Sequence, residues 1–156
     1  MNIGIIVHSH TGNTLRVAQR LQKELSAAGH SASIQRVSAI NDDESDAQKI
    51  RLSQKPDVSA YDMLLFGAPV RGFSLSPVMR AYLSVIGSLE GKKAGCFMTQ
   101  GFPAPWMGGI RALKQMVDLC QSKGAIPYGT GIVNWPNAAK REKLIAAVVD
   151  ELRAIQ

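Results

Sequence analysis

The chain has 156 residues, of which 46% are hydrophobic and 19% are charged, and its formal net charge is +6. This length fits a single domain, residues 1–156, that can bury a core without metal or disulfide support, and the composition excludes a disordered chain. No apolar run reaches the roughly 18 residues that a membrane span needs. Because the first residues also lack a signal-peptide pattern, we expect a cytoplasmic protein with no membrane partner.

The positive charge favours anionic partners such as nucleotides or acidic proteins. The lysines and arginines are spread along the chain, without the basic tract and interleaved aromatic residues of nucleic-acid binders, so we expect no nucleic acid. Cys96 and Cys120 lie in apolar patterns and are predicted to be buried free thiols. Together with three scattered histidines they give no metal-ligand spacing, and no metal is predicted.

Five apolar runs alternate with amphipathic patterns along the chain. The runs are typical of strands buried on both faces and cover residues 2–8, 32–37, 63–68, 94–98 and 126–133. Helical spacing predicts helices over residues 13–28, 77–86 and 108–123, and from Pro136 onward. In the third of these helices we expect Ile110 to face inward. A short helix is expected around residues 47–52, after an acidic cluster at residues 42–46 that we interpret as a solvated surface.

Buried strands that alternate with helices form a parallel sheet covered on both faces, because crossover connections are right-handed. The expected fold is therefore α/β, an open doubly wound sheet. In such sheets ligands bind beyond the carboxyl ends of the strands. Three segments should meet there, namely residues 8–14, 68–76 and 99–108.

The first of these segments gathers small hydrogen-bonding residues between a strand and a helix. A helix begins with free N–H groups and the positive end of its dipole, so such a loop can surround a phosphate using neutral donors alone. Gly12 allows close approach of the ligand, and the other donors are Ser9, Thr11, Asn13 and Thr14. The loop lacks the lysine of a Walker motif and the glycines of a dinucleotide fingerprint. The alternative is a polar helix cap that binds nothing.

The run Ser9-His10-Thr11-Gly12-Asn13-Thr14 resembles the phosphate loop of flavodoxins, Ser/Thr-x-Thr-Gly-x-Thr. Two further stretches, residues 66–71 and 79–83, are similar to the third strand, flavin loop and following helix of flavodoxin-like quinone reductases. The resemblance implies a flavodoxin-like fold of the short form, with five parallel strands in the order 2-1-3-4-5. It also implies one FMN, held noncovalently.

By this resemblance the isoalloxazine ring lies between the second and third segments. The second offers Pro69, Val70, Arg71, Gly72 and Phe73, and the third offers Thr99, Gln100, Gly101, Phe102, Pro103 and Trp106. Gly72 is then a candidate neighbour of the flavin N5, and Trp106 or Phe73 is the expected stacking partner. His10 either donates to the phosphate or ribityl chain or faces solvent. Trp135 is expected to pack in the core.

Three features depart from typical flavodoxins: His8 replaces the usual aromatic residue before the loop, the third segment lacks the usual Asp/Tyr pattern beside the flavin, and the chain is basic rather than acidic. A positive charge about 10 Å from the ring would favour reduced, anionic flavin by roughly 1.7 kcal/mol, or near 70 mV before salt screening. Arg71 is the residue best placed for this effect. The alternative is a solvated arginine on a surface loop.

No constellation of catalytic acid, base or nucleophile is apparent, so FMN would supply the chemistry. The first hypothesis is an electron carrier between protein partners. An alternative is an NAD(P)H-dependent quinone or FMN reductase, and a second is a phosphate-ligand binding module without flavin. The sequence indicates neither the redox partner, whether a protein or NAD(P)H, nor the oligomeric state.

Overall fold

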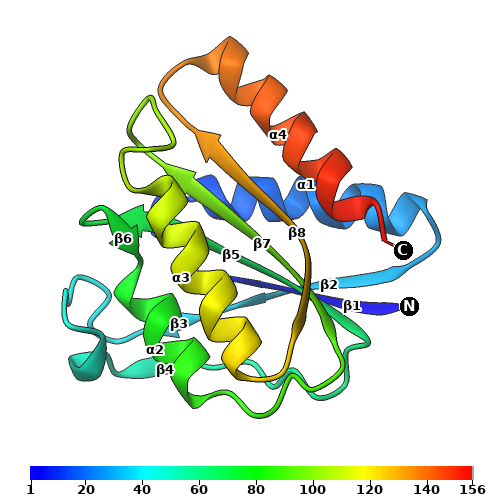
Figure 1. The fold of residues 1–156 in the computed structure, drawn as a ribbon, viewed down its shortest axis with the longest axis horizontal. Coiled ribbons are helices and arrows are strands. Elements are labelled where there is room, and N and C mark those ends of the chain that lie inside the picture. The colour runs from blue at the N-terminus through cyan, green and yellow to red at the C-terminus, as the bar shows by residue number, and fades with distance from the viewer. Residues whose placement is uncertain (156) are drawn as a thin grey trace.

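The computed structural model describes residues 1–155, and an open parallel sheet forms its centre (Figure 1). The long strands are β1 (Asn2–Val7), β2 (Ser31–Arg36), β5 (Met63–Arg71), β7 (Lys93–Gln100) and β8 (Ile126–Asn134). They pair in parallel in the order β2-β1-β5-β7-β8. This is the predicted order 2-1-3-4-5, and the predicted fold class is confirmed.

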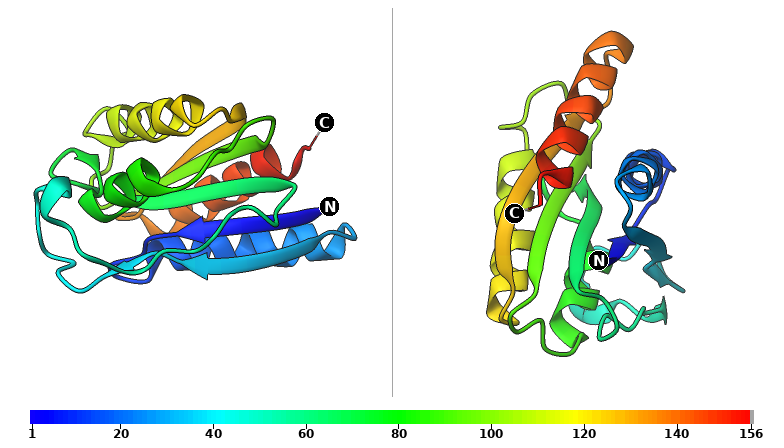
Figure 2. Two further views of the ribbon diagram at one scale, coloured as in Figure 1. Left: turned by 90° about the horizontal axis from the view of Figure 1, so that it is seen from below. Right: turned by 90° about the vertical axis from the view of Figure 1, so that its right-hand side faces the viewer.

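Two helices cover each face of the sheet, as the two views of Figure 2 show. The helices are α1 (Asn13–Ala27), α2 (Pro77–Val85), α3 (Gly109–Ser122) and α4 (Ala138–Arg153). One core lies between the sheet and α1 with α4, and includes Leu21 and Ile145. The other lies under α2 and α3 and includes Tyr82 and Met116. Each large apolar side chain buried in these layers contributes about 1.5–3 kcal/mol to folding.

Close packing within the sheet fixes the middle strand. Gly67 lies on β5, and a Cβ added there would overlap the ring of Phe97 on the neighbouring strand β7. Both β5 and β7 are buried along most of their length, which explains why their sequences read as continuous apolar runs. The paired strands β5 and β7 therefore place the second and third predicted segments at the same edge of the sheet.

The helix expected around residues 47–52 is wrong. The chain instead forms a two-stranded antiparallel sheet from β3 (Ser38–Ala39) and β4 (Leu52–Gln54), with a single 3-10 turn, η1 (Ala47–Lys49), between them. We call residues 38–54 the excursion. It lacks the apolar stripe that would hold a longer helix against the core, and it lies beside α2 (Figure 1).

The inward position predicted for Ile110 is also wrong, because α3 turns Ala112, Met116 and Cys120 to the core and leaves Ile110 57% exposed. Cys96 and Cys120 are buried free thiols, as predicted. Strand β5 runs past Ala68 to Arg71 and pairs with β6 (Ser74–Leu75), a hairpin that the sequence analysis did not predict. Within residues 1–155, no helix has the length and apolar character needed to cross a membrane.

Candidate functional site

A cavity of about 200 Å³ lies at the carboxyl ends of β1, β5 and β7. All three predicted segments contribute to its wall. The lining residues are His10, Thr11, Asn13, Pro69, Val70, Arg71, Thr99, Gln100 and Gly101. The topology therefore brings together nine of the residues that the sequence analysis proposed for cofactor binding.

The loop before α1 leaves a set of main-chain donors free. Gly12 has φ +93°, a left-handed conformation that suits glycine, and forms the N-cap of the helix. The hydroxyl of Ser9 accepts the N–H groups of Gly12 and Leu15, at 3.1 and 3.3 Å. The remaining N–H groups of the loop have no acceptor within residues 1–155; they belong to Ser9, His10, Thr11, Asn13 and Thr14. These donors stand at the positive end of the α1 dipole, where an anion is stabilised.

Thr14 and Thr99 join the first segment to the third. Their hydroxyl oxygens lie 2.8 Å apart, and both side chains are buried. In this structure the two hydroxyls therefore bond each other, although the sequence analysis proposed both as ligand donors. Their bond fixes the distance between the phosphate loop and the end of β7.

Two buried amides shape the third segment. The side-chain N–H groups of Gln100 and Asn134 both donate to the carbonyl of Phe102, and Gln100 also donates to the carbonyl of Ala104. The Oε1 atom of Gln100 is buried without a hydrogen-bond partner among residues 1–155. These bonds fix the chain after β7, where Gly101 lines the cavity.

The second segment ends in a tight turn under strain. Gly72 and Phe73 occupy the two positions between Arg71 and Ser74, and both have left-handed backbones, with φ +57° and +61°. A bulky residue rarely adopts this conformation. Phe73 stacks on Phe102, with ring centroids 5.1 Å apart and planes at 8°. Trp106, the other predicted stacking residue, is 76% exposed and does not line the cavity.

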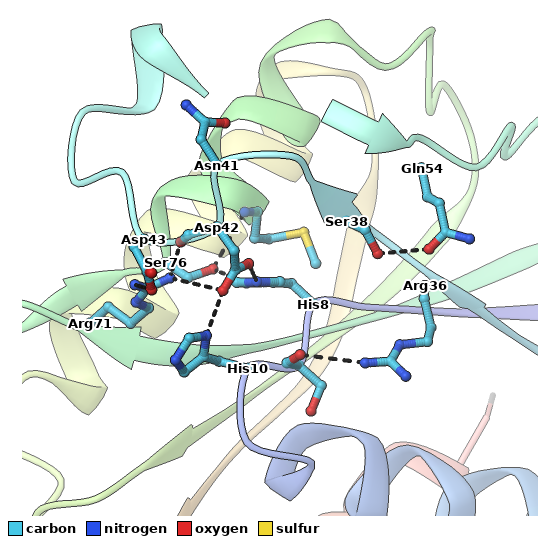
Figure 3. Close-up of polar contacts among 12 residues, drawn as sticks. His8, His10, Arg36, Ser38, Asn41, Asp42, Asp43, Gln54, Arg71 and Ser76 are labelled. Carbon is cyan, nitrogen blue, oxygen red and sulfur yellow. Dashed lines mark hydrogen bonds and ion pairs between the residues drawn. The ribbon is translucent and has the colours of Figure 1, made fainter. Parts of the chain in front are cut away.

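A polar cluster at the cavity rim, shown in Figure 3, centres on Asp42 from the excursion. One carboxylate oxygen lies 2.7 Å from His8 Nε2 and the other 2.5 Å from His10 Nδ1. Arg71 donates to the main-chain carbonyl of Asp42 at 2.6 Å. The second ring nitrogen of His8 lies 2.9 Å from the hydroxyl of Ser76, the residue that caps α2.

Burial lowers the pKa of His8, although its hydrogen bond to Asp42 opposes this effect. Burial alone would raise the pKa of Asp42, but the hydrogen bonds from the two histidines outweigh it and hold that pKa below its usual value. Asp42 is therefore ionised and His8 neutral near pH 7. Arg71 also lies 3.6 Å from the Asp42 carboxylate and 3.9 Å from that of Asp43, so its charge is compensated.

Two interpretations from the sequence change with this cluster. Arg71 was expected to place a positive charge beside the flavin, but two carboxylates face its guanidinium and oppose that charge. The interpretation of the whole acidic run as solvated surface is wrong at Asp42, whereas Asp43 is 94% exposed along its side chain. His10, Asp42 and Asp43 bring possible metal-ligand atoms within 4.8 Å of one another. Hydrogen bonding between the first two and the adjacent guanidinium make this an internally paired cluster.

Trp135 was expected to pack in the core, and the structure places it there only in part. It lies just after β8, packs partly against the core under α1 and α4, and is half-buried. The guanidinium groups of Arg141 and Arg16 lie 5.0 and 5.8 Å from the centre of its ring. Trp135 thus has a cationic neighbourhood beside the start of α1, a feature that its position in the sequence did not reveal.

Comparison with known proteins agrees with this architecture. Residues 4–105 match a family model described as a flavodoxin domain. The chain is 30% identical to a flavodoxin of Megasphaera elsdenii over 136 residues, which cover 85% of each protein. Among solved structures, a flavodoxin of Streptococcus pneumoniae TIGR4 superimposes with a TM-score of 0.69 at 17% identity, covering 99% of both chains.

A flavoprotein of Lactobacillus acidophilus NCFM, solved in complex with FMN, gives a TM-score of 0.61 at 14% identity and covers 92% of this chain and 97% of its own. At such identities these two structures support the fold alone. The family model covers more than half of the sequence, and the Megasphaera relative aligns along most of it. On these grounds, and with the five-stranded sheet and its phosphate-type loop in place, the chain belongs to the flavodoxin family.

Proposed function

We propose that this protein binds one FMN noncovalently at the cavity and carries electrons to or from a redox partner protein. The observation that carries the proposal is the set of five N–H groups without an acceptor among residues 1–155 at the start of α1, on a loop whose only charged or titratable side chain is His10. A phosphate ester accepts several such hydrogen bonds at once, and charge-assisted bonds of this kind are about twice as strong as neutral ones.

The donor set fits the chemistry of FMN. Thr11 and Asn13 line the cavity beside the free N–H groups and add a hydroxyl and an amide for the phosphate and ribityl chain. Pro69 and Val70 supply apolar wall at the other end, where a ring system can exclude water. When bound, FMN supplies the redox chemistry. The flavodoxin relatives and the FMN-containing neighbour support the same cofactor.

The residues of this chain would hold and orient the cofactor. The first segment would hold the phosphate, while Pro69 and Val70 of the second segment and Gly101 of the third would border the ring. Among the described residues, neither the second nor the third segment places a nucleophile or a free carboxylate in the cavity wall. This arrangement favours electron transfer over covalent catalysis. We expect a donor and acceptor of protein class, with NAD(P)H as the alternative donor.

Anaerobic spectroscopy of the purified protein tests this proposal. We expect a yellow protein whose visible absorbance is not bleached by NADPH alone but is bleached after a catalytic amount of a flavin-dependent reductase is added. Bleaching by NADPH alone would instead support the reductase hypothesis. A colourless protein that takes up no FMN would contradict both and leave a phosphate-binding module.

A further inference from the structure

Asp42 reaches the cavity rim from outside the three segments that form the wall. It belongs to the excursion, and Asn41 anchors its neighbourhood by accepting the N–H of Arg51 and donating to the carbonyl of Lys49. Among residues 1–155, the hydrogen bonds and ion pairs that connect the excursion to His8, His10 and Arg71 all involve Asp42 or Asp43. Figure 3 shows these three side chains directed at Asp42.

The hydrogen bonds fix the proton positions in this cluster. The hydroxyl oxygen of Ser76 accepts the N–H of Met79 at 3.3 Å, so its own proton is available for His8 Nδ1, 2.9 Å away. The proton of neutral His8 then lies on Nε2 and is donated to Asp42. Asp42 thus selects one tautomer of a histidine that is 1% exposed.

Asp42 contacts two residues of the cavity wall. The second oxygen of its carboxylate bonds Nδ1 of His10, and the rest of that ring lines the cavity. The main-chain carbonyl of Asp42 accepts an N–H of the Arg71 guanidinium at 2.6 Å, and the carboxylate adds an ion pair with Arg71 at 3.6 Å. Arg71 lines both this cavity and a neighbouring one of about 370 Å³. One residue of the excursion therefore sets the side chains that flank the opening from both the first and the second segment.

We propose that Asp42 is a positioning residue that holds His10 and Arg71 in place for the cofactor, so that FMN binding depends on this carboxylate. The inference rests on the proposed binding of FMN. It predicts a change in FMN affinity opposite in direction to the one that simple electrostatics predicts, because removal of a negative charge near an anion site should tighten binding. If Asp42 positions the wall, its loss weakens binding.

A matched pair of variants separates the two effects. Asp42→Asn and Asp43→Asn remove the same charge at adjacent positions, but Asp43 is exposed and makes only the 3.9 Å contact with Arg71. By calorimetric titration with FMN at pH 7.5, we expect Asp42→Asn to raise the Kd about tenfold or more. Asp43→Asn should leave the Kd within about twofold or lower it. Equal Kd values for the two variants would overturn the proposal.

A double-mutant cycle tests whether Asp42 acts through His10. His10→Gln alters a side chain that is 43% exposed and should fold normally. If Asp42 works by orienting His10, the double variant Asp42→Asn/His10→Gln loses less affinity than the product of the two single losses. Strictly multiplicative losses would show that the coupling is absent and would count against a positioning role.

A measurement without flavin distinguishes failure of this inference from failure of FMN binding. Nitrogen NMR of the histidines in apoprotein should show His8 as the neutral Nε2–H tautomer at pH 7.5. The ring signals of His8 and His10 should move in Asp42→Asn and stay in place in Asp43→Asn. Unchanged signals in Asp42→Asn would refute the role of Asp42 even if FMN binds; moved signals would support it even if FMN does not.

Discussion

In the loop at the start of α1, residues 9–14 leave five main-chain donors without acceptors in the described chain, whereas the side chains of the rim cluster around Asp42 already have partners. The loop is built from six consecutive residues. The rim cluster joins His8, Asp42 and Ser76, which lie 34 residues or more apart in sequence. The loop therefore offers unpaired hydrogen-bond donors to a ligand. The rim cluster offers side chains whose positions are fixed by contacts between residues far apart in sequence.

This contrast separates the groups that provide affinity for an anion from the groups that define the shape of the site. N–H groups without a protein acceptor gain most when an anion arrives, because they exchange only water for charge-assisted bonds and lose no bond within the protein. Paired groups such as Arg71 gain little charge attraction but define the outline of the site. We therefore expect changes in the two regions to be read by different measurements. The predictions below run from the largest expected effect to the smallest.

The bond that joins the first and third segments should carry the largest effect on stability. Thr14→Val keeps the shape of the side chain but leaves the Thr99 hydroxyl buried without its 2.8 Å partner. We expect the free energy of unfolding in urea to fall by about 1–3 kcal/mol. Thr14→Val/Thr99→Val should recover much of this loss, because both polar groups are then gone. An unchanged urea midpoint in the single variant would show that the bond does not contribute.

The left-handed backbone at Gly12 should have the next largest effect on stability. Gly12→Ala introduces a Cβ at φ +93°, and although no atom lies within 4 Å of it, the backbone conformation is strained. We expect a loss of about 1–2 kcal/mol in the free energy of unfolding. Gly87→Ala is the matched control, since its Cβ also meets no atom and its φ is not positive. Equal thermal midpoints for both variants would contradict the conformational argument.

The Phe73–Phe102 pair tests strain at the ring end. Phe102→Ala removes the stacked pair and should lower the free energy of unfolding by about 0.5–1.5 kcal/mol. Phe73→Gly loses the same pair but relieves the left-handed backbone at φ +61°. In urea denaturation Phe73→Gly should therefore remain more stable than Phe102→Ala by about 1 kcal/mol. The reverse order would mean that the turn is not strained.

The titration of His8 should make stability depend on pH. Its pKa in the folded protein is lowered from 6.5, so the unfolded chain takes up the proton first. The free energy of unfolding should accordingly fall as the pH drops below about 6.5, toward the lowered pKa. Asp42 adds its own loss only below about 3.8, its usual pKa. His8→Gln should flatten the decline near pH 6; an equally steep decline in that variant would assign it to other groups.

The smallest effect concerns the charge of Arg71. An unpaired guanidinium about 10 Å from the ring would shift the potential by near 70 mV, but Asp42 and Asp43 compensate this one. Because the charges of Arg71 and Asp42 oppose each other at the ring, the double variant Arg71→Ala/Asp42→Asn, which removes one charge of each sign, should differ from wild type by clearly less than that value in a redox titration of the FMN-loaded protein. A full shift in the double variant would show that the Asp42 carboxylate does not offset the arginine at the flavin.

What the sequence could predict follows the same division between the two regions. The parallel sheet and the loop at residues 9–14 follow from local patterns, since apolar runs, helix starts and glycine positions act over a few residues. The mutual bond of Thr14 and Thr99 could not be read this way, because 85 residues separate them. Asp42 looked like surface because its neighbours are charged, and only the excursion, where a helix had been expected, carries it to His8. The unusual His8 was the one signal that pointed to this cluster.

The central claim is that free donors at the start of α1 bind the phosphate of FMN, and a calorimetric comparison of FMN with riboflavin tests it most directly. The two ligands share the ring and the ribityl chain and differ only in the phosphate. We predict that apoprotein binds FMN at least about 100-fold more tightly than riboflavin, because several charge-assisted hydrogen bonds are lost without the phosphate. Equal affinities for the two ligands, or no heat with FMN, would contradict the account.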